Sequence, residues 1–81
     1  MEVIVSDDGG YAHLKPAGRI ESSNAPLFEQ TLMAHLVDAG RSVLVDLSGV
    51  DFVSSAGLRV FLLGAKKAKG TSANLVVCAM D

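Results

Sequence analysis

A chain of 81 residues with a net charge of −2 has room for one domain, and its scattered acids and bases leave no basic footprint for nucleic acid. No apolar run is long enough to span a membrane, and we expect no signal peptide because the first residues include acids rather than a basic and then apolar stretch. With a lone cysteine and 49% hydrophobic residues, the sequence predicts a cytoplasmic single domain over residues 1–81 that keeps apolar surface for a partner.

A hairpin is predicted at the start of the chain. Residues 2–5 and 11–15 flank the turn signal at residues 7–10, whose glycines supply the positive φ of a tight turn. Polar and apolar residues alternate in the second strand, which is the period of a sheet with one solvent-facing side. Pro16 cannot donate to a strand ladder, so we expect an edge or a break there, with residues 17–20 continuing the strand after a kink.

A first helix is predicted after the hairpin. Ser23 or Asn24 can cap it, and Pro26 suits its first turn. Apolar residues at four-residue spacing form a stripe that should face the core: Phe28, Leu32 and Leu36. The helix should end at residue 38 or 39, because Gly40 is a typical C-terminal stop.

The second half of the chain predicts a strand, a loop, a helix and a strand. Residues 42–47 form a strand whose run 43–45 is continuously apolar, which suits a central parallel strand covered on both faces, and Asp46 is the exception. Residues 48–53 form a loop, a helix covers about 55–69, and residues 74–80 form a last apolar strand. Right-handed crossovers would place both helices on one face, so we predict an α/β fold with a small mixed sheet.

The second helix should have one core-facing side and one mixed side. Four residues at helical spacing form the stripe expected to face the core: Leu58, Phe61, Leu62 and Ala65. Val60 and Leu63 fall off this stripe, and Leu63 lies on the side of Arg59 and Lys66. An apolar residue beside two cations predicts a partner contact; the alternative is that small domains simply expose some leucine.

Motifs for catalysis, cofactors and metals are missing from the sequence. It has neither a dinucleotide fingerprint nor a phosphate-binding loop, and its serines do not lie in a hydrolase elbow. His13 and His35 are isolated, whereas a metal needs clustered ligands. Cys78 lies in an apolar strand, where a buried and inert thiol is expected. We therefore expect no enzyme, no cofactor and no metal.

Four polar residues remain around the junction of strand and second helix: Asp46, Asp51, Ser54 and Ser55. Either serine can be the N-cap of the helix, and Asp46 can satisfy backbone amides in the loop. The alternative is a regulatory phosphate, which unpaired N–H groups and partial positive charge at a helix start would stabilise without unfolding the helix. Its nearly two negative charges would then repel a partner that docks on this surface.

The run from Leu44 to Arg59 resembles the signature of the STAS domain, named for sulfate transporters and anti-sigma factor antagonists. It has Asp-Leu-Ser-Gly at the strand end and Ser-Ser-Ala-Gly at the helix start, and the resemblance extends over essentially the whole chain. It implies a bacterial antagonist that binds an anti-sigma factor, itself a serine kinase, and so regulates transcription indirectly. Phosphorylation ends this binding and a phosphatase restores it. By the family pattern, Ser55 is the phosphorylated serine.

The sequence departs from the family pattern beside that serine. Ser54 stands where the family usually has an aspartate, which makes Ser54 the alternative acceptor, and Ala56 stands where the family has a second hydroxyl residue. We expect the neighbouring residues Asp46, Asp51 and Gly57 to support the switch loop.

The sequence also ends early by the family pattern. Family members continue past the last strand into another helix, whereas this sequence ends at Asp81. We therefore expect the domain to lack its C-terminal helix, as a fragment or as a natural short form. Apolar surface near Val76 and Cys78 should then be exposed, which predicts self-association or exchange of elements between chains.

Two other functions stay open on the sequence. The chain can be a non-switching interaction module of the same fold, such as a subunit of a lipid-transport or stress-signalling assembly, in which the serines form a cap and a contact surface. It can also be an enzyme with Ser55 as nucleophile, although no base is visible near that serine. Neighbouring genes would separate the first two functions, since a sigma factor and a kinase would accompany a switch and transporter components an interaction subunit. Absence of hydrolase activity against ester substrates would exclude the enzyme.

Overall fold

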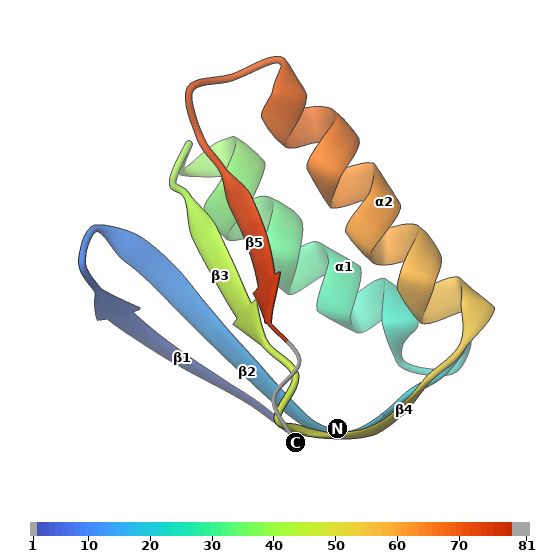
Figure 1. Ribbon diagram of the computed structural model, residues 1–81. Helices are drawn as coiled ribbons and strands as arrows, with labels where there is room; N and C mark the ends of the chain where they lie inside the picture. Colours follow the sequence, from blue (N-terminus) through green and yellow to red (C-terminus); the bar gives the residue numbers. More distant parts are fainter. Residues whose placement is uncertain (1, 79–81) are drawn as a thin grey trace.

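The computed structural model describes residues 2–78, in which two helices cover one face of a mixed sheet (Figure 1). In chain order the elements are β1 (Glu2–Asp8), β2 (Tyr11–Ile20), α1 (Ala25–Met33), the π-helical segment η1 (Ala34–Asp38), β3 (Val43–Asp46), β4 (Gly49–Val53), α2 (Ser55–Lys69) and β5 (Leu75–Cys78). The predicted fold class, α/β with a small mixed sheet and helices on one face, is confirmed.

β2 is the strand around which the sheet is built. β1 pairs with it antiparallel, while β3 and then β4 pair with it in parallel and β5 extends the sheet beyond β3. The register with β3 ends at Leu14 and the register with β4 begins at Ala17. Pro16, which has no N–H to donate, lies where the neighbouring strand changes. The predicted edge or break at Pro16 is therefore wrong, since this residue is fully buried inside a continuous strand.

The core lies between the sheet and the helices. Ala12 and Leu14 of β2 are fully buried, while the residues that alternate with them face the other side, as predicted. The predicted stripe of the first helix is confirmed and is buried: Phe28, Leu32 and Leu36. Leu44 in the middle of β3 is only half-buried, so this strand is covered on one face rather than on two.

The first helix begins and ends where the sequence predicts. Asn24 is its N-cap residue, but its side chain closes the preceding loop instead of capping: it accepts from the Glu21 N–H at 2.8 Å and donates to the Arg19 carbonyl at 2.8 Å. The helix continues through the wider turn of η1 to Asp38 and stops at Gly40, whose φ of +63° suits glycine.

The bounds predicted for α2 are confirmed, but the face predicted to be buried is wrong except at Phe61, which is half-buried and packs edge-on against Phe28. Leu58 and Leu62 are 54% and 71% exposed. The buried residues are mostly small: Gly57, Val60, Gly64 and Ala68. A Cβ added at Gly64 would lie 2.9 Å from Leu75 Cδ2 and 3.1 Å from Leu32 Cδ2. α2 therefore packs closely through its small residues, and the larger leucines point outward.

Two strand predictions also need correction. Residues 48–53, predicted as a loop, contain β4, which pairs with the last residues of β2. In the last strand β5 confirms the stretch from Leu75 to Cys78, while residues 79–80 of the prediction lie outside the described part. Cys78 is half-buried rather than buried as predicted.

Candidate functional site

The two serines singled out by the sequence lie at a corner where two parallel strands end and two helices begin (Figure 1). β2 leads into α1 and β4 leads into α2. The backbone N–H of Ser54 donates to the carbonyl of Ile20 at 2.8 Å, which ties the start of α2 to the end of β2. In α/β proteins, the carboxyl ends of parallel strands are the usual place for binding sites.

Ser54 is the N-cap of α2. Its backbone is extended, with φ −77° and ψ 173°, and its Oγ accepts a hydrogen bond from the Gly57 N–H at 3.3 Å. This bond satisfies one of the N–H groups that a helix start leaves unpaired. The capping role expected for one of the two serines is therefore confirmed for Ser54.

Ser55 is the first residue of α2, and it is exposed. The hydrogen bonds described for residues 2–78 include the Ser54 cap, but none is made by the Ser55 side chain. The two adjacent serines thus differ in what their hydroxyl groups can do. Ser54 holds the helix start, and Ser55 presents its hydroxyl to solvent beside the first-turn N–H groups.

Gly57 lets the first turn of α2 rest directly on the strand ends. It is buried, and a Cβ added there would lie 2.8 Å from Ile20 Cγ2 and 2.9 Å from Val53 Cγ1. These two side chains branch at Cβ and have little rotational freedom. The absence of a side chain at Gly57 therefore sets where the helix and its serines stand on the sheet.

Asp46 serves its own loop. Its Oδ1 accepts a hydrogen bond from the Ser48 N–H at 2.9 Å, which closes the turn between β3 and β4. This hydrogen bond from the Ser48 backbone is the main cause that lowers the pKa of the Asp46 carboxyl. The expectation that Asp46 satisfies a backbone amide is confirmed, and its described hydrogen bond involves neither Ser54 nor Ser55.

Asp51 forms a bulge in β4. Gly18 pairs with Val50 and the next residue, Arg19, pairs with Phe52, so Asp51 is the extra residue of the bulge, and it is exposed. Gly18 opposite the bulge has a φ of +95°, which glycine adopts without strain. A bulge of this kind changes the direction of the strand just before Ser54 and Ser55.

Sequence reasoning missed a contact at the same end of the sheet. The Arg19 guanidinium lies 4.3 Å from the centre of the Phe52 ring, and its Nε donates to Glu21 at 3.1 Å. Such a stack over an aromatic face is favourable for a cation. The sequence signal that could have predicted this contact is the apolar character of residues 49–53. It identifies a strand only once its partner in β2 is known.

The solvent-facing side of α2 carries a stripe of exposed residues at i, i+4, i+7 and i+11, here called the outer stripe: Ser55, Arg59, Leu62 and Lys66. Residues at this spacing share one helix face. Leu63, predicted to lie with Arg59 and Lys66 at a partner surface, is half-buried. The apolar residue exposed between the two cations is Leu62.

Charge is unevenly distributed between α2 and the rest of the chain. None of the nine acidic residues lies in α2, whereas four of the seven basic residues do: Arg59, Lys66, Lys67 and Lys69. Together with the exposed leucines Leu58 and Leu62, these cations make α2 a basic surface with an apolar centre.

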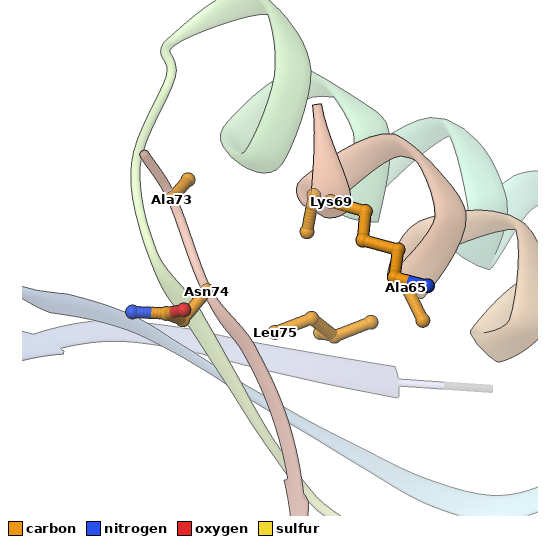
Figure 2. A pocket seen from close by; sticks show the side chains of 6 residues that line it. Ala65, Lys69, Ala73, Asn74 and Leu75 are labelled. Atoms are coloured by element: carbon orange, nitrogen blue, oxygen red, sulfur yellow. The ribbon is translucent and has the colours of Figure 1, made fainter. Parts of the chain in front are cut away.

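In the described part of the chain there is a hollow near each end of α2. A groove of about 140 Å³ lies between the starts of α1 and α2, lined in part by Glu29 of α1 and Arg59 of α2. A second hollow of about 200 Å³ lies at the other end of α2, and Figure 2 shows the side chains around it: Ala65, Lys69, Ala73, Asn74 and Leu75. Only the first hollow adjoins the serine corner.

The remaining candidate residues lie apart in the fold. His13 is in the middle of β2, and His35 is in η1, where its Nδ1 lies 2.9 Å from the Thr31 carbonyl oxygen. Within residues 2–78 no group of three or more His, Cys, Asp or Glu side chains could hold a metal ion. Among the described helices, none is long and apolar enough to cross a membrane.

Comparison with known sequences identifies relatives. The family model described as "Mlab, STAS domain" matches residues 4–81. A putative anti-sigma factor antagonist of Bordetella bronchiseptica, BtrV, is 41% identical over 63 residues, which are 78% of this chain and 54% of that protein. The anti-sigma-F factor antagonist RsfB of Mycobacterium tuberculosis is 31% identical over 67 residues, or 83% of this chain and 55% of that protein. The chain thus spans about half the length of these curated relatives.

Solved structures share the fold. An anti-sigma factor antagonist from Mycobacterium paratuberculosis superposes with a TM-score of 0.87 at 28% identity, over 99% of this chain and 68% of that one. The unphosphorylated anti-sigma factor antagonist SpoIIAA gives a TM-score of 0.78 at 6% identity, over 94% of this chain and 71% of that one. At 6% identity, the match with SpoIIAA shows a shared fold and nothing more.

Proposed function

Because this chain belongs to the STAS domain family, we propose that it acts as an anti-sigma factor antagonist that a serine kinase switches off. In this proposal the unmodified chain binds an anti-sigma factor, itself the kinase, and so regulates transcription indirectly in the cytoplasm. The names of its sequence relatives support the antagonist role. Phosphorylation would end the binding, and a phosphatase would reset the chain.

The observation that carries the switch is the exposed hydroxyl of Ser55. A kinase needs an accessible acceptor, and the Ser54 hydroxyl is already engaged in the cap while that of Ser55 faces solvent. A phosphate on the first residue of α2 would sit beside unpaired N–H groups, so the helix would tolerate it. The modification would change the charge of the surface and leave the fold intact.

We propose the outer stripe, with Leu58 beside it, as the partner surface. Exposed leucines next to Arg59 and Lys66 match a partner surface that is apolar at its centre and acidic at its rim. A phosphate adds about −1.5 to −2 charges at the end of this surface, which offsets roughly half of the positive charge of α2. Loss of charge complementarity is then the physical reason for release.

A regulatory role fits the surroundings of Ser55 better than catalysis. A nucleophilic serine needs a base within hydrogen-bond reach, and the described hydrogen bonds of residues 2–78 give its side chain no such partner. The two histidines lie in the middle of β2 and in η1. The proposed chemistry at Ser55 is therefore performed by another protein.

Binding to the cognate anti-sigma kinase tests this function. Ser55→Ala should bind like the parent chain, and Ser55→Asp should lose most of the affinity, as measured by isothermal titration calorimetry. Ser72→Asp is the matched control, because Ser72 is an exposed serine just past the other end of α2. Full binding by Ser55→Asp would contradict the switch and favour the non-switching interaction subunit.

We also propose that β5 mediates self-association. β5 is an edge strand of the described sheet, it carries no charged residue, and Val76 and Val77 are 38% and 42% exposed. An apolar edge without charge invites pairing with another strand. A second copy of the chain can supply that strand.

A further inference from the structure

A phosphate on Ser55 would have one α2 cation within a turn of the helix, namely Arg59. Both residues are exposed on the outer stripe at i and i+4, where Cβ atoms are about 5–6 Å apart and side chains meet. The acid would also precede the base in the chain, which is the more favourable order on a helix. The next cation of α2, Lys66, is eleven residues from Ser55, roughly 16 Å along the helix axis.

Arg59 can take a new anionic partner without breaking an existing ion pair. The ion pairs described for arginines in residues 2–78 involve Arg19 and Arg41, not Arg59. Arg59 instead lines the groove between α1 and α2, together with Glu29. In the unmodified chain its guanidinium is thus a cation presented at the rim of a groove, within the proposed partner surface.

We propose that Arg59 is the internal counter-ion of phosphorylated Ser55, so that modification withdraws this cation from the partner while it adds negative charge. The inference rests on the proposed function, since it takes Ser55 as the acceptor. A guanidinium binds phosphate oxygens through two parallel hydrogen bonds, which an exposed ammonium cannot do. The phosphate therefore acts twice: it repels an acidic partner, and it occupies the arginine that this partner would contact.

The test uses phosphoserine built into position 55 during synthesis of the chain, without a kinase, and a phosphorus NMR titration of the folded product. The second pKa of the phosphate should be about 0.3 units lower in the parent than in Arg59→Gln, which is what an exposed i, i+4 ion pair provides. Lys66→Gln removes the same charge from the same stripe and should titrate like the parent. Glu29, the acid that lines the groove with Arg59, is present in all three chains. Salt should reduce the difference.

Equal midpoints in the parent and Arg59→Gln, or an equal shift in Lys66→Gln, would overturn the inference. Circular dichroism of each chain establishes that it is folded. This failure differs from failure of the proposed function. If the kinase leaves Ser55 unmodified, or if the phosphorylated chain binds the kinase as well as the unmodified one, the antagonist switch fails whatever the titration gives.

Discussion

Replacing Gly57 with alanine should destabilise the domain, and the same change at Gly64 should cost less. The new Cβ at position 57 would lie 2.8 Å from Ile20 Cγ2 and 2.9 Å from Val53 Cγ1. Both methyl groups belong to β-branched side chains, and Ile20 is fully buried, so neither can turn away freely. The contacts at position 64 are with the Cδ2 atoms of two leucines, at 2.9 and 3.1 Å, and these chain ends can move.

The magnitude follows from two opposing effects. Overpacking a core costs about 1–3 kcal/mol, while alanine in place of glycine in a helix returns about 1 kcal/mol. We expect a net loss of up to about 2 kcal/mol for Gly57→Ala, whose neighbours cannot move away, and a change near zero for Gly64→Ala. Gly70→Ala is the control, since its φ is −88° and its nearest neighbour would be 3.9 Å away. In a domain of this size each 1 kcal/mol lowers Tm by about 4–8 °C.

Urea unfolding, monitored by circular dichroism, measures the order of stability of these variants directly. Gly57→Ala should have the lowest midpoint, and Gly64→Ala and Gly70→Ala should lie close to the parent. If Gly57→Ala is as stable as the parent, α2 does not pack as tightly on the ends of β2 and β4 as the distances at Gly57 imply. The reasoning about how the serines are positioned would then be refuted.

Three further outcomes are expected. Leu62→Ala should weaken binding to the anti-sigma kinase about tenfold, while Leu27→Ala, at a similarly exposed leucine on α1, should not; equal effects would refute the assigned surface. Hydrogen bonding lowers the pKa of Asp46 below its ordinary 3.8, so the charged form stabilises the fold above that pH and this contribution is lost as pH falls through the folded-state pKa. Acid unfolding should therefore be less steep for Asp46→Asn, and an unchanged profile would contradict the role of this hydrogen bond. Light scattering over a concentration series should detect association of the parent and less of Val76→Lys; a parent monomer throughout would exclude β5 pairing.

Local signals made the helix bounds predictable. α2 begins after a capping serine and ends before a glycine, and its bounds coincide with those predicted. β4 lacked such signals, because residues 49–53 become a strand only by pairing with the distant end of β2. The break predicted at Pro16 was wrong for the same reason. A missing N–H is harmless where β2 changes its partner from β3 to β4, and only the tertiary register reveals that change.

The buried face of α2 was misjudged because the pattern favoured large side chains. Close packing needs Gly57 against the ends of β2 and β4, and it needs Gly64 against Leu75 of β5 and Leu32 of α1. Hydrophobic periodicity ignores such glycines, and this packing turns Leu62 outward. The serine pair itself was recognisable in the sequence. Which serine caps the helix and which faces solvent depends on backbone geometry at Ser54, and the sequence could not decide between them.

Mass spectrometry after incubation with the cognate anti-sigma kinase and ATP tests the central claim most directly. The account predicts a single phosphate on Ser55 in the parent chain and none in Ser55→Ala, while Ser54→Gly, which loses the side-chain cap, still accepts phosphate at Ser55. A parent chain that stays unmodified, or one that carries its phosphate on Ser54, would contradict it.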